Sequence, residues 1–414
     1  MKLLIAIPAL NEEASIRQII ERSLAARQPI IDRSPVTEVE VTVVSDGSTD
    51  RTAEIARRYA DRIHLIEFAE NRGYGAAILE AWRQSDAEIL GFLDADGTCD
   101  PLFFTELCNR LEEDSADVVL GCRLHEESRM PWVRRLGNKL FSGLLTVLSS
   151  RRVRDTASGM RVVRRTSLEK LMPLPAGLHF TPAMSARALL RQDVVIREID
   201  MPYHERAGES KLHASRDGLR FLAIIFDAAF LYRPSRPLAL FGIGAVAVAS
   251  VLMVSPALFY LQNHRVEEWM IYRFIVSHLL ASSGLLAVCA AHVSRKVVGV
   301  AVLPDRGDRP VHTLLSRLFA SVWFWLAPLA LAALGVALVV PSLLELAQTG
   351  ATYEHWSRFI AMSFFLSSAF TLVVARVMDH SVNLIAGKLD YARRPPDEPP
   401  AEPRGGRGED SSDR

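Results

Sequence analysis

The sequence predicts a soluble α/β domain with a mostly parallel sheet, followed by a region of four transmembrane helices. Two observations lead to this fold class. Short apolar runs alternate with helix-like segments over residues 1 to about 235, the usual order in a parallel sheet covered on both faces. Residues 238–378 then contain apolar runs long enough to cross a bilayer. The chain has 48 basic and 48 acidic side chains, so no global attraction to nucleic acid is expected.

Each expected strand is a short run of apolar or β-branched residues, and more polar segments separate the strands. The expected strands are Leu3–Ile7, Val39–Val44, His64–Phe68, Ile89–Leu93 and Val118–Gly121. The expected helices are Glu12–Ala26, Arg51–Tyr59, Ala76–Gln84 and Leu102–Glu112. Asn11, Asp50 and Asp100 stand where a side chain can cap the first turn of a helix.

Polar and glycine-containing loops follow four of these strands. Because the carboxyl ends of parallel strands meet at one edge of a sheet, we expect the loops to form a single ligand site there. The loops are Pro8–Glu12, Ser45–Asp50, Asn71–Gly75 and Asp94–Asp96. The sequence has no G-x-x-x-x-G-K-[ST] and no G-x-G-x-x-G after the first strand, which disfavours a P-loop or an NAD-type cradle.

The segment Asp94-Ala95-Asp96 is the most informative part of this edge. Side chains two residues apart on a strand share a face, so both carboxylates can point the same way. Two carboxylate ligands suit Mg²⁺ or Mn²⁺, which commonly accompany a diphosphate. The alternative is a solvated turn in which Asp100 caps the helix that begins at Pro101.

Four apolar runs are long enough to span a bilayer, and the charges between them predict an orientation. The runs are Leu238–Leu261, Ile271–Val293, Leu318–Leu344 and Phe359–Met378. The link over residues 294–317 is rich in Lys and Arg, whereas the link over 345–357 has none. The positive-inside rule then places both termini in the cytoplasm of an integral protein of the cell membrane.

Two amphipathic segments precede the first apolar run. Ser215–Tyr232 is expected to lie on the inner leaflet, with Arg233 and Arg236 beside it to attract anionic head groups. Trp132–Leu148 has the same character, and an ordinary surface helix is the alternative for it. The expected organisation is therefore a soluble domain at 1–213, an interfacial helix at 214–236, a transmembrane domain at 237–380 and a disordered tail at 393–414.

Seven motifs in series carry a resemblance to a known family. They are PALNEE, SDGSTDRT, ENRGYGAA, DADG, GCR, DTASGMR and RAGESKL. Over about residues 1–232 the chain resembles glycosyltransferase family 2, and within it the polyprenyl-phosphate enzymes of the dolichol-phosphate mannose synthase type. The resemblance implies a GT-A fold, a nucleotide-diphosphate sugar donor and Mg²⁺ or Mn²⁺. It also implies transfer to dolichyl or undecaprenyl phosphate on the cytoplasmic leaflet, and it leaves room for a homo-oligomer.

The resemblance also assigns roles to residues of this chain. It implies nucleotide contacts at Pro8, Asn11, Glu12, Asp46, Asn71, Gly73 and Asp94, and a metal pair at Asp94 and Asp96. It implies acceptor-phosphate contacts at Arg123, at Arg134 or Arg135, and at Arg206, Ser210 and Lys211. Asp94, Asp96, Arg123 and Lys211 are the implied catalytic residues. For Asp155, in DTASG, acceptor-side positioning and plain helix capping are equal alternatives.

Two departures from the family pattern and two rival functions remain open. Ser45 stands where many relatives have an acid, and Thr98 stands where the mannose enzymes often have Gln, which weakens a guess of mannose. A processive polysaccharide synthase would carry a late Q-x-x-R-W segment, and this chain has no Arg-Trp pair. A non-enzymatic lipid flippase or sugar-nucleotide sensor is the second rival. For the enzyme we expect direct displacement with inversion at the anomeric carbon.

Overall fold

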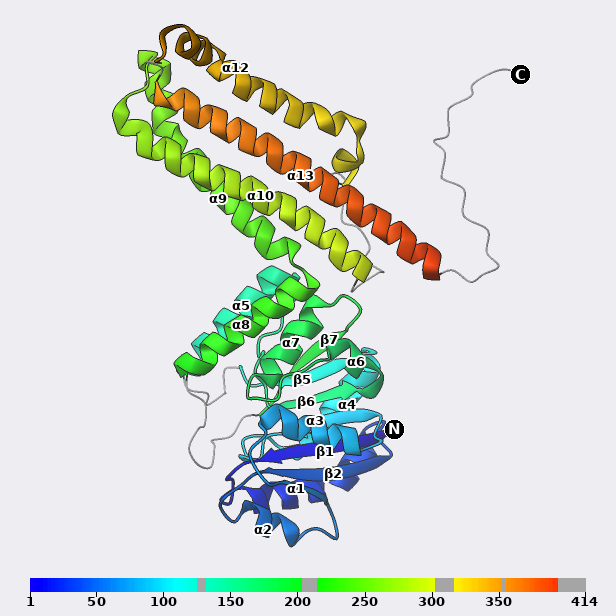
Figure 1. Ribbon diagram of the computed structural model, residues 1–414. Coiled ribbons are helices and arrows are strands. Elements are labelled where there is room, and N and C mark those ends of the chain that lie inside the picture. The colour runs from blue at the N-terminus through cyan, green and yellow to red at the C-terminus, as the bar shows by residue number, and fades with distance from the viewer. Residues whose placement is uncertain (125–131, 203–213, 302–315, 352–354, 394–414) are drawn as a thin grey trace, which may run out of the picture. The chain divides into compact units, whose positions relative to one another are not determined.

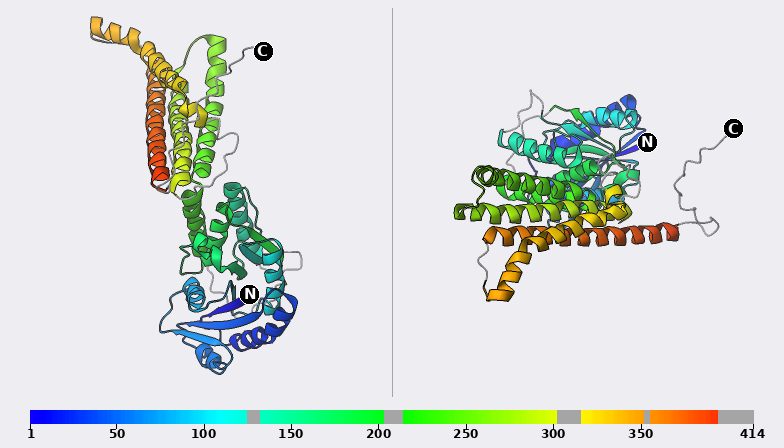
Figure 2. Two further views of the ribbon diagram at one scale, coloured as in Figure 1. Left: turned by 90° about the vertical axis from the view of Figure 1, so that its right-hand side faces the viewer. Right: turned by 90° about the horizontal axis from the view of Figure 1, so that it is seen from above.

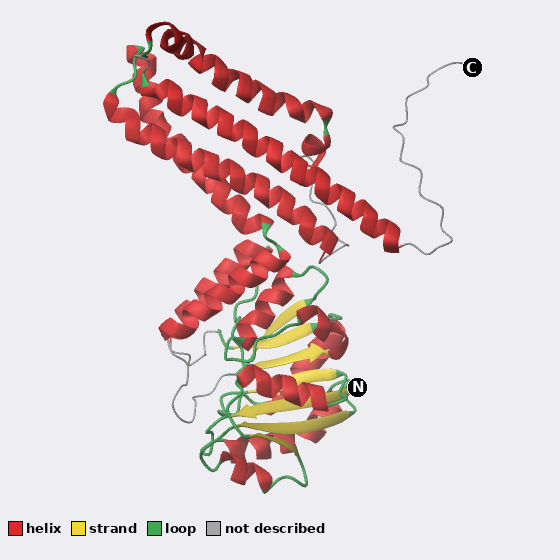
Figure 3. Cartoon of the chain, in the orientation of Figure 1, coloured by secondary structure: helices red, strands yellow, loops and turns green. Residues whose placement is uncertain are grey.

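The computed structural model describes residues 1–124, 132–202, 214–301, 316–351 and 355–393 (Figures 1 and 3). The chain forms two compact units, Met1–Leu240 and Phe241–Arg414. The first unit holds the sheet and the helices that cover it. The second consists of long apolar helices.

A seven-stranded mixed sheet forms the centre of the first unit (Figure 3). Its strands, in spatial order, are β3 (His64–Phe68), β2 (Glu38–Asp46), β1 (Lys2–Ala9), β4 (Ile89–Leu93), β6 (Met160–Arg164), β5 (Val118–Cys122) and β7 (Ile196–Asp200). Strand β6 runs antiparallel to β4 and β5, and the other pairings are parallel. The expectation of a mostly parallel α/β sheet is therefore confirmed.

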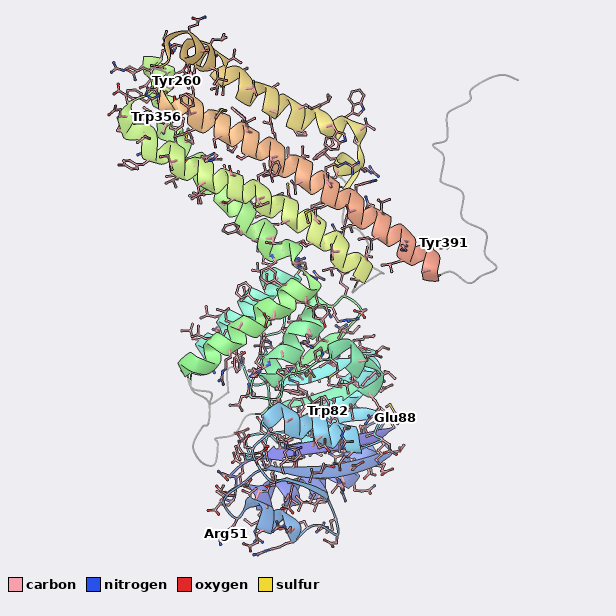
Figure 4. All side chains as sticks on the ribbon, viewed as in Figure 1. Arg51, Trp82, Glu88, Tyr260, Trp356 and Tyr391 are labelled. Carbon is pink, nitrogen blue, oxygen red and sulfur yellow. The ribbon has the colours of Figure 1, made fainter. Side chains whose placement is uncertain are left out.

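Helices cover both faces of the sheet. They are α1 (Ile16–Arg33), α2 (Thr52–Arg57), α3 (Tyr74–Gln84), η1 (Pro101–Phe103), α4 (Phe104–Glu113), η2 (Arg165–Ser167), α6 (Leu168–Leu171) and α7 (Phe180–Leu190). On one face, alternate residues of β1 such as Leu3 and Ile5 pack with buried residues of α1 and α4. On the other face, Trp82 of α3, Phe92 of β4 and Phe180 of α7 form an aromatic cluster. Figure 4 labels Trp82.

The helix cap expected at Asn11 is wrong. Helix α1 begins at Ile16, whereas Asn11 has a left-handed backbone with φ 49°. The Asn11 side chain instead accepts a hydrogen bond from the backbone N–H of Thr49 at 2.8 Å, which ties the loop after β1 to the loop after β2. Asp100 does cap η1, because its carboxylate accepts from the backbone N–H of Leu102 at 3.0 Å.

Two amphipathic helices pack on one another in the first unit (Figure 1). They are α5 (Trp132–Ser149) and α8 (Ala214–Tyr232), and Phe141 and Phe221 meet edge to face with their ring centroids 5.8 Å apart. Both helices also expose large apolar side chains to their surroundings. These are Leu136, Leu140 and Val147 on α5, and Leu219, Phe230 and Leu231 on α8.

Arg233 does not have the expected role of attracting lipid head groups. Its side chain is buried, and it donates to the backbone carbonyls of Leu190 at 2.9 Å and Ser149 at 3.0 Å. Arg236 donates to the carbonyl of Val147 at 3.0 Å. The carbonyls at helix C-termini lack partners within the helix, so an adjacent guanidinium is a natural donor to them. Arg233 therefore ties α5 and α7 to the end of α8.

The second unit confirms the expectation of four helices that are long and apolar enough to cross a membrane (Figure 2). These segments are Ser235–Asn263, Glu268–Ala301, Val322–Thr349 and Trp356–Leu389. The helices are α9 (Ser235–Asn263), η3 (Glu268–Met270) with α10 (Ile271–Ala301), η4 (Val322–Trp325) with α12 (Leu326–Thr349), and α13 (Trp356–Arg393). Gly242 and Gly284 allow α9 and α10 to approach closely, because a Cβ on Gly242 would lie 2.7 Å from the Gly284 carbonyl oxygen.

A charged cluster joins α10 to α13 within this unit. The carboxylate of Asp379 is fully buried and lies 2.5 Å from Lys296 Nζ, 2.9 Å from His292 Nε2 and 3.3 Å from a guanidinium nitrogen of Arg376. The His292 ring also stacks on Phe319, with the centroids 4.3 Å apart. His292 is therefore a packed residue that contacts the charged cluster between the two helices through Asp379.

Candidate active site

The first unit has a pocket of about 410 Å³ at the carboxyl ends of β1, β2 and β4. It collects most of the residues that the resemblance nominated. Its walls are Pro8, Ala9, Leu10, Glu12, Asp46, Asn71, Gly73, Tyr74, Asp94, Ala95, Asp96, Arg123, Ala157, Gly159, Gly177, Leu178, Thr181, Arg220 and Phe221. Ligands of open α/β sheets bind at such an edge, so this pocket is the candidate active site.

The two carboxylates of the expected metal pair both line the pocket, and neighbouring hydroxyls orient them. Asp94 follows β4 directly, and its Oδ1 accepts a hydrogen bond from the Tyr74 hydroxyl at 2.6 Å. Asp96 Oδ1 accepts from Thr98 Oγ1 at 2.6 Å and from the Thr98 backbone N–H at 3.1 Å. Burial, reinforced by the Asp94 carboxylate, raises the pKa of Tyr74 well above its ordinary value, so its hydroxyl remains a donor.

Gly159 gives Asp94 the space that it occupies. A Cβ on Gly159 would lie 1.8 Å from Asp94 Oδ2, a distance that no real contact reaches. The backbone N–H of Asp94 also donates to the Gly159 carbonyl at 3.2 Å. A glycine is therefore required beside the end of β4, and the DTASGMR motif supplies it.

Asp46 holds the loop after β3 in place. Its two carboxylate oxygens accept from the backbone N–H groups of Arg72 at 2.7 Å and Gly73 at 2.9 Å. Gly73 has φ 106°, and a Cβ there would lie 2.5 Å from the carbonyl oxygen of Ala176. Asp46 thus fixes the shape of one wall of the pocket, and its contact with a nucleotide stays a prediction.

Arg123 is held by a buried carboxylate. Its guanidinium donates to both oxygens of Asp155, at 2.7 and 3.0 Å, and to the carbonyl of Ala157 at 2.7 Å. Asn138 of α5 donates to the same carboxylate at 2.6 Å. Asp155 is 0% exposed and the Arg123 side chain 13% exposed.

Asp155 therefore orients Arg123, and a role of this pair toward the acceptor stays a prediction. Burial by itself would raise the pKa of Asp155. The Arg123 guanidinium and the hydrogen bond from Asn138 outweigh that effect and hold the pKa below its ordinary value. The carboxylate is consequently charged at neutral pH, and the pair keeps Arg123 in a defined orientation at the pocket wall.

Several nominated residues do not reach the pocket or cannot be placed. Arg206, Ser210, Lys211 and the side chain of Arg134 lie outside the described residues. Arg135 is half-buried on α5, and neither it nor Asn11 belongs to the described pocket lining.

Sequence reasoning missed several lining residues because their placement depends on tertiary packing. Tyr74 and Gly159 stood inside the motifs ENRGYGAA and DTASGMR without a role of their own. Arg220 and Phe221 come from the amphipathic helix α8, which the sequence linked only to the membrane. The helical spacing of α8 gave no signal that one of its faces meets the pocket.

The residues at the end of β4 fit a divalent metal whose coordination is completed by its substrate. Among the described residues, no group of three or more His, Cys, Asp or Glu side chains could hold an ion alone. Mg²⁺ and Mn²⁺ at phosphate sites usually take one or two protein carboxylates and fill the remaining positions with phosphate oxygens and water. Asp94 and Asp96, both on the pocket wall, match that donor set.

Comparisons with known proteins identify the family of the chain. Residues 4–172 match the model of the family described as glycosyl transferase family 2. The low-salt glycan biosynthesis hexosyltransferase Agl6 of Haloferax volcanii is 33% identical over 60% of this chain and 58% of its own length. The dolichyl-phosphate hexose transferase of the same organism is 36% identical over 49% of this chain and 82% of its own length.

A bacterial transferase is also similar to this chain. The undecaprenyl-phosphate 4-deoxy-4-formamido-L-arabinose transferase of Photorhabdus laumondii is 30% identical over 51% of this chain and 62% of its own length. The chain thus spans less than two thirds of the length of some of these relatives, and the match to the family model lies within the first unit. The chain belongs to glycosyltransferase family 2, in the group of polyprenyl-phosphate sugar transferases.

Proposed function

We propose that the protein transfers a sugar from a nucleotide-diphosphate sugar to a polyprenyl phosphate at the cytoplasmic leaflet, with inversion at the anomeric carbon. One observation carries this proposal: the residues that line the pocket differ in kind from one side of the sheet to the other. Loops after β1, β2 and β3 form one side, the carboxylates after β4 lie in the middle, and Arg123 after β5 lies on the other side. That order matches a nucleotide, a diphosphate with its metal, and an anionic acceptor.

On the nucleotide side, the loops offer backbone groups and small residues at the pocket wall. Pro8, Glu12 and Asn71 line this side, and Asp46 holds the loop around Gly73. We assign the base and ribose to these loops. A divalent ion bound at Asp94 and Asp96 would supply Lewis-acid stabilisation to the diphosphate as it leaves.

On the acceptor side, the reaction needs orientation and charge more than a general base. A phosphate monoester has its second pKa near 6, so it is largely a dianion at neutral pH and already a nucleophile. Arg123, held by Asp155, can present a fixed guanidinium to that dianion. Direct attack on the anomeric carbon then inverts its configuration, and no covalent enzyme intermediate is needed.

The apolar surfaces of the chain suit an acceptor that cannot leave the bilayer. The second unit has four helices long and apolar enough to cross a membrane. In the first unit, α5 and α8 expose large apolar side chains, including Leu140 at 64% and Leu219 at 71%. We assign both helices to the membrane surface, with the termini in the cytoplasm, since amphipathic helices of this kind bind at the interface.

The test uses the purified full-length protein in detergent with a short polyprenyl phosphate, Mg²⁺ or Mn²⁺, and a panel of radiolabelled nucleotide sugars. We expect label from one donor to enter the organic phase, and chelation of the metal with EDTA to stop it. Asp96→Asn should lower the rate at least about 100-fold. Asp61→Asn makes the same chemical change at an exposed position and should leave the rate unchanged.

The other outcomes separate the rival functions. Donor binding without transfer to any lipid would contradict the proposal and favour a sensor. Label in a water-soluble polymer would favour a polysaccharide synthase. Retention of the donor's anomeric configuration in the lipid product, measured by NMR, would contradict the inverting mechanism.

A further inference from the structure

We propose that Arg220 of the amphipathic helix α8 binds the acceptor phosphate inside the pocket. This assignment rests on the proposed function, and it identifies a residue that links the membrane-facing helix to the reacting groups. Arg220 and its neighbour Phe221 both line the pocket that Asp94, Asp96 and Arg123 also line.

The packing of α8 fixes where Arg220 points. Phe221, Ile225 and Ala229 are spaced by one helical turn and are all buried, so they form the face that packs on the rest of the first unit. Leu219 is 71% exposed and belongs to the opposite, apolar face. Successive helical residues are rotated by about 100°. Arg220 therefore lies at the boundary between the buried face and the exposed apolar face.

That boundary is where a lipid phosphate would meet the protein. If the face with Leu219 rests on acyl chains, a side chain at the boundary lies at the level of the head groups. The long stem of an arginine can follow the apolar surface while the guanidinium reaches polar surroundings. Arg220 is exposed on α8 and also reaches the pocket wall, so it has access to both places.

The negative charge in the pocket favours a cation at the position of Arg220. Among the described lining residues, Arg123 and Arg220 are the cationic ones. Asp94 and Asp96 add two negative charges, which suit a divalent ion but not an incoming phosphate dianion. A second guanidinium can bind the dianion bidentately and offset its charge.

The position of α8 assigns Arg220 to the acceptor rather than to the donor. Helix α8 packs on α5 and α7, and α5 contributes Asn138, which binds the carboxylate that holds Arg123. The nucleotide loops follow β1, β2 and β3, on the far side of β4 in the sheet. Arg220 therefore belongs to the same side of the pocket as Arg123.

The test measures the KM values for donor and for polyprenyl phosphate with full-length protein in lipid nanodiscs. Arg220→Gln should raise the acceptor KM roughly 10- to 100-fold and leave the donor KM within about twofold. Arg220→Lys should recover part of the loss, because it restores the charge but not the planar fork. The matched control is Lys139→Gln, which removes an exposed cation from α5 outside the described pocket lining. Its two KM values should equal those of the wild type.

Two results would overturn the assignment. Arg220→Gln could behave like Lys139→Gln, or it could raise the donor KM as much as the acceptor KM. Unchanged binding of the donor nucleotide to Arg220→Gln would show that the pocket is still folded.

A binding measurement separates this inference from the proposed function. Farnesyl phosphate, farnesol and inorganic phosphate are titrated against the thermal unfolding of the wild type and of Arg220→Gln. Farnesyl phosphate should stabilise the wild type more than either of the others, and that extra stabilisation should be lost in Arg220→Gln. If the wild type transfers no sugar but retains this difference, the proposed function fails and the phosphate site stands. Equal stabilisation of both proteins would contradict the site, and stabilisation by inorganic phosphate alone would exclude a lipid source.

Discussion

The two units of the chain each bury a carboxylate against cations, and the two clusters serve different ends. In the first unit, Asp155 is fully buried and binds Arg123, whose guanidinium lies at a pocket wall. In the second, Asp379 is fully buried and binds Lys296 and His292, which lie on a neighbouring helix. One cluster orients a cation toward a space that a ligand can enter, whereas the other joins α10 to α13.

Burial of an ion pair does not by itself identify a functional site. Asp379 is an ionisable residue within an apolar helix, and such residues are usually expected to be functional. Its partners nevertheless come from α10 and from α13 itself, and the His292 ring is stacked on Phe319. Asp155 differs from Asp379 because its partner, Arg123, lines the pocket. Loss of the carboxylate should therefore lower mainly the stability at Asp379 and mainly the activity at Asp155.

Loss of the carboxylate in the second unit should have the largest effect on stability. Asp379→Ala leaves Lys296 and Arg376 without their buried counter-charge, which typically costs about 3 kcal/mol or more. We expect a lower midpoint of unfolding in detergent and an unchanged kcat for the fraction that remains folded. His380→Gln, at the exposed neighbouring position, should change neither quantity. If Asp379→Ala had normal stability and no activity, the cluster in the second unit would have a functional role and this assignment would be wrong.

Loss of the carboxylate in the first unit should act on catalysis. Asp155→Asn leaves Arg123 in place without the charge that orients it, so we expect kcat/KM for the lipid phosphate to fall roughly 100-fold. The donor KM should change little, because the nucleotide loops lie across the sheet. Steady-state kinetics on both substrates measure this split. An equal increase in both KM values would indicate a general structural role instead.

A smaller loss is expected when Asp94 is displaced without being removed. A Cβ in Gly159→Ala would overlap Asp94 Oδ2, so the affinity for Mn²⁺ should fall about tenfold, measured as the metal concentration for half-maximal rate. Gly143→Ala on α5 is the matched control, since a Cβ there meets nothing within 4 Å. The control should keep wild-type metal dependence. If both variants behaved alike, the close contact at Gly159 would not matter for the metal.

The smallest expected effect is on stability in acid. Because the pKa of Asp155 is held below its ordinary value of 3.8, its pairing contributes stability above that value and loses it as pH falls toward the lowered pKa. Unfolding of the full-length protein followed between about pH 5 and pH 2 should show this loss, and Asp155→Asn should reduce it. An identical pH dependence in wild type and variant would show that the pair does not control acid stability.

Much of the fold could be predicted because its strands are continuous buried runs. Strand β4 is buried at all five positions and matches the predicted Ile89–Leu93. Strands β6 and β7 were missed. Strand β6 includes Arg161 and Arg164, and β7 has the polar composition of a surface segment, which its edge position tolerates. Asn11 was predicted to cap a helix because asparagine is common both at helix N-termini and in left-handed loop conformations. In the structure it adopts the left-handed conformation.

The candidate site could be predicted only where it consists of strand-end loops. Asp94 and Asp96 follow a recognisable strand, so their place at the sheet edge follows from topology. Arg220 reaches the pocket only through the packing of α8 on α5 and α7, which no local pattern encodes. Arg233 was assigned to lipid head groups for the same reason, although it binds helix-end carbonyls.

The identity of the acceptor tests the proposed sugar transfer most directly. With the donor found in the panel, the full-length protein in liposomes is given polyprenyl phosphate, the matching polyprenol or no added lipid, and the products are analysed by mass spectrometry. We expect a polyprenyl phosphate that carries one sugar, formed only with the phosphorylated lipid. Sugar attached to the polyprenol, or an equal amount of a water-soluble product without added lipid, would contradict it.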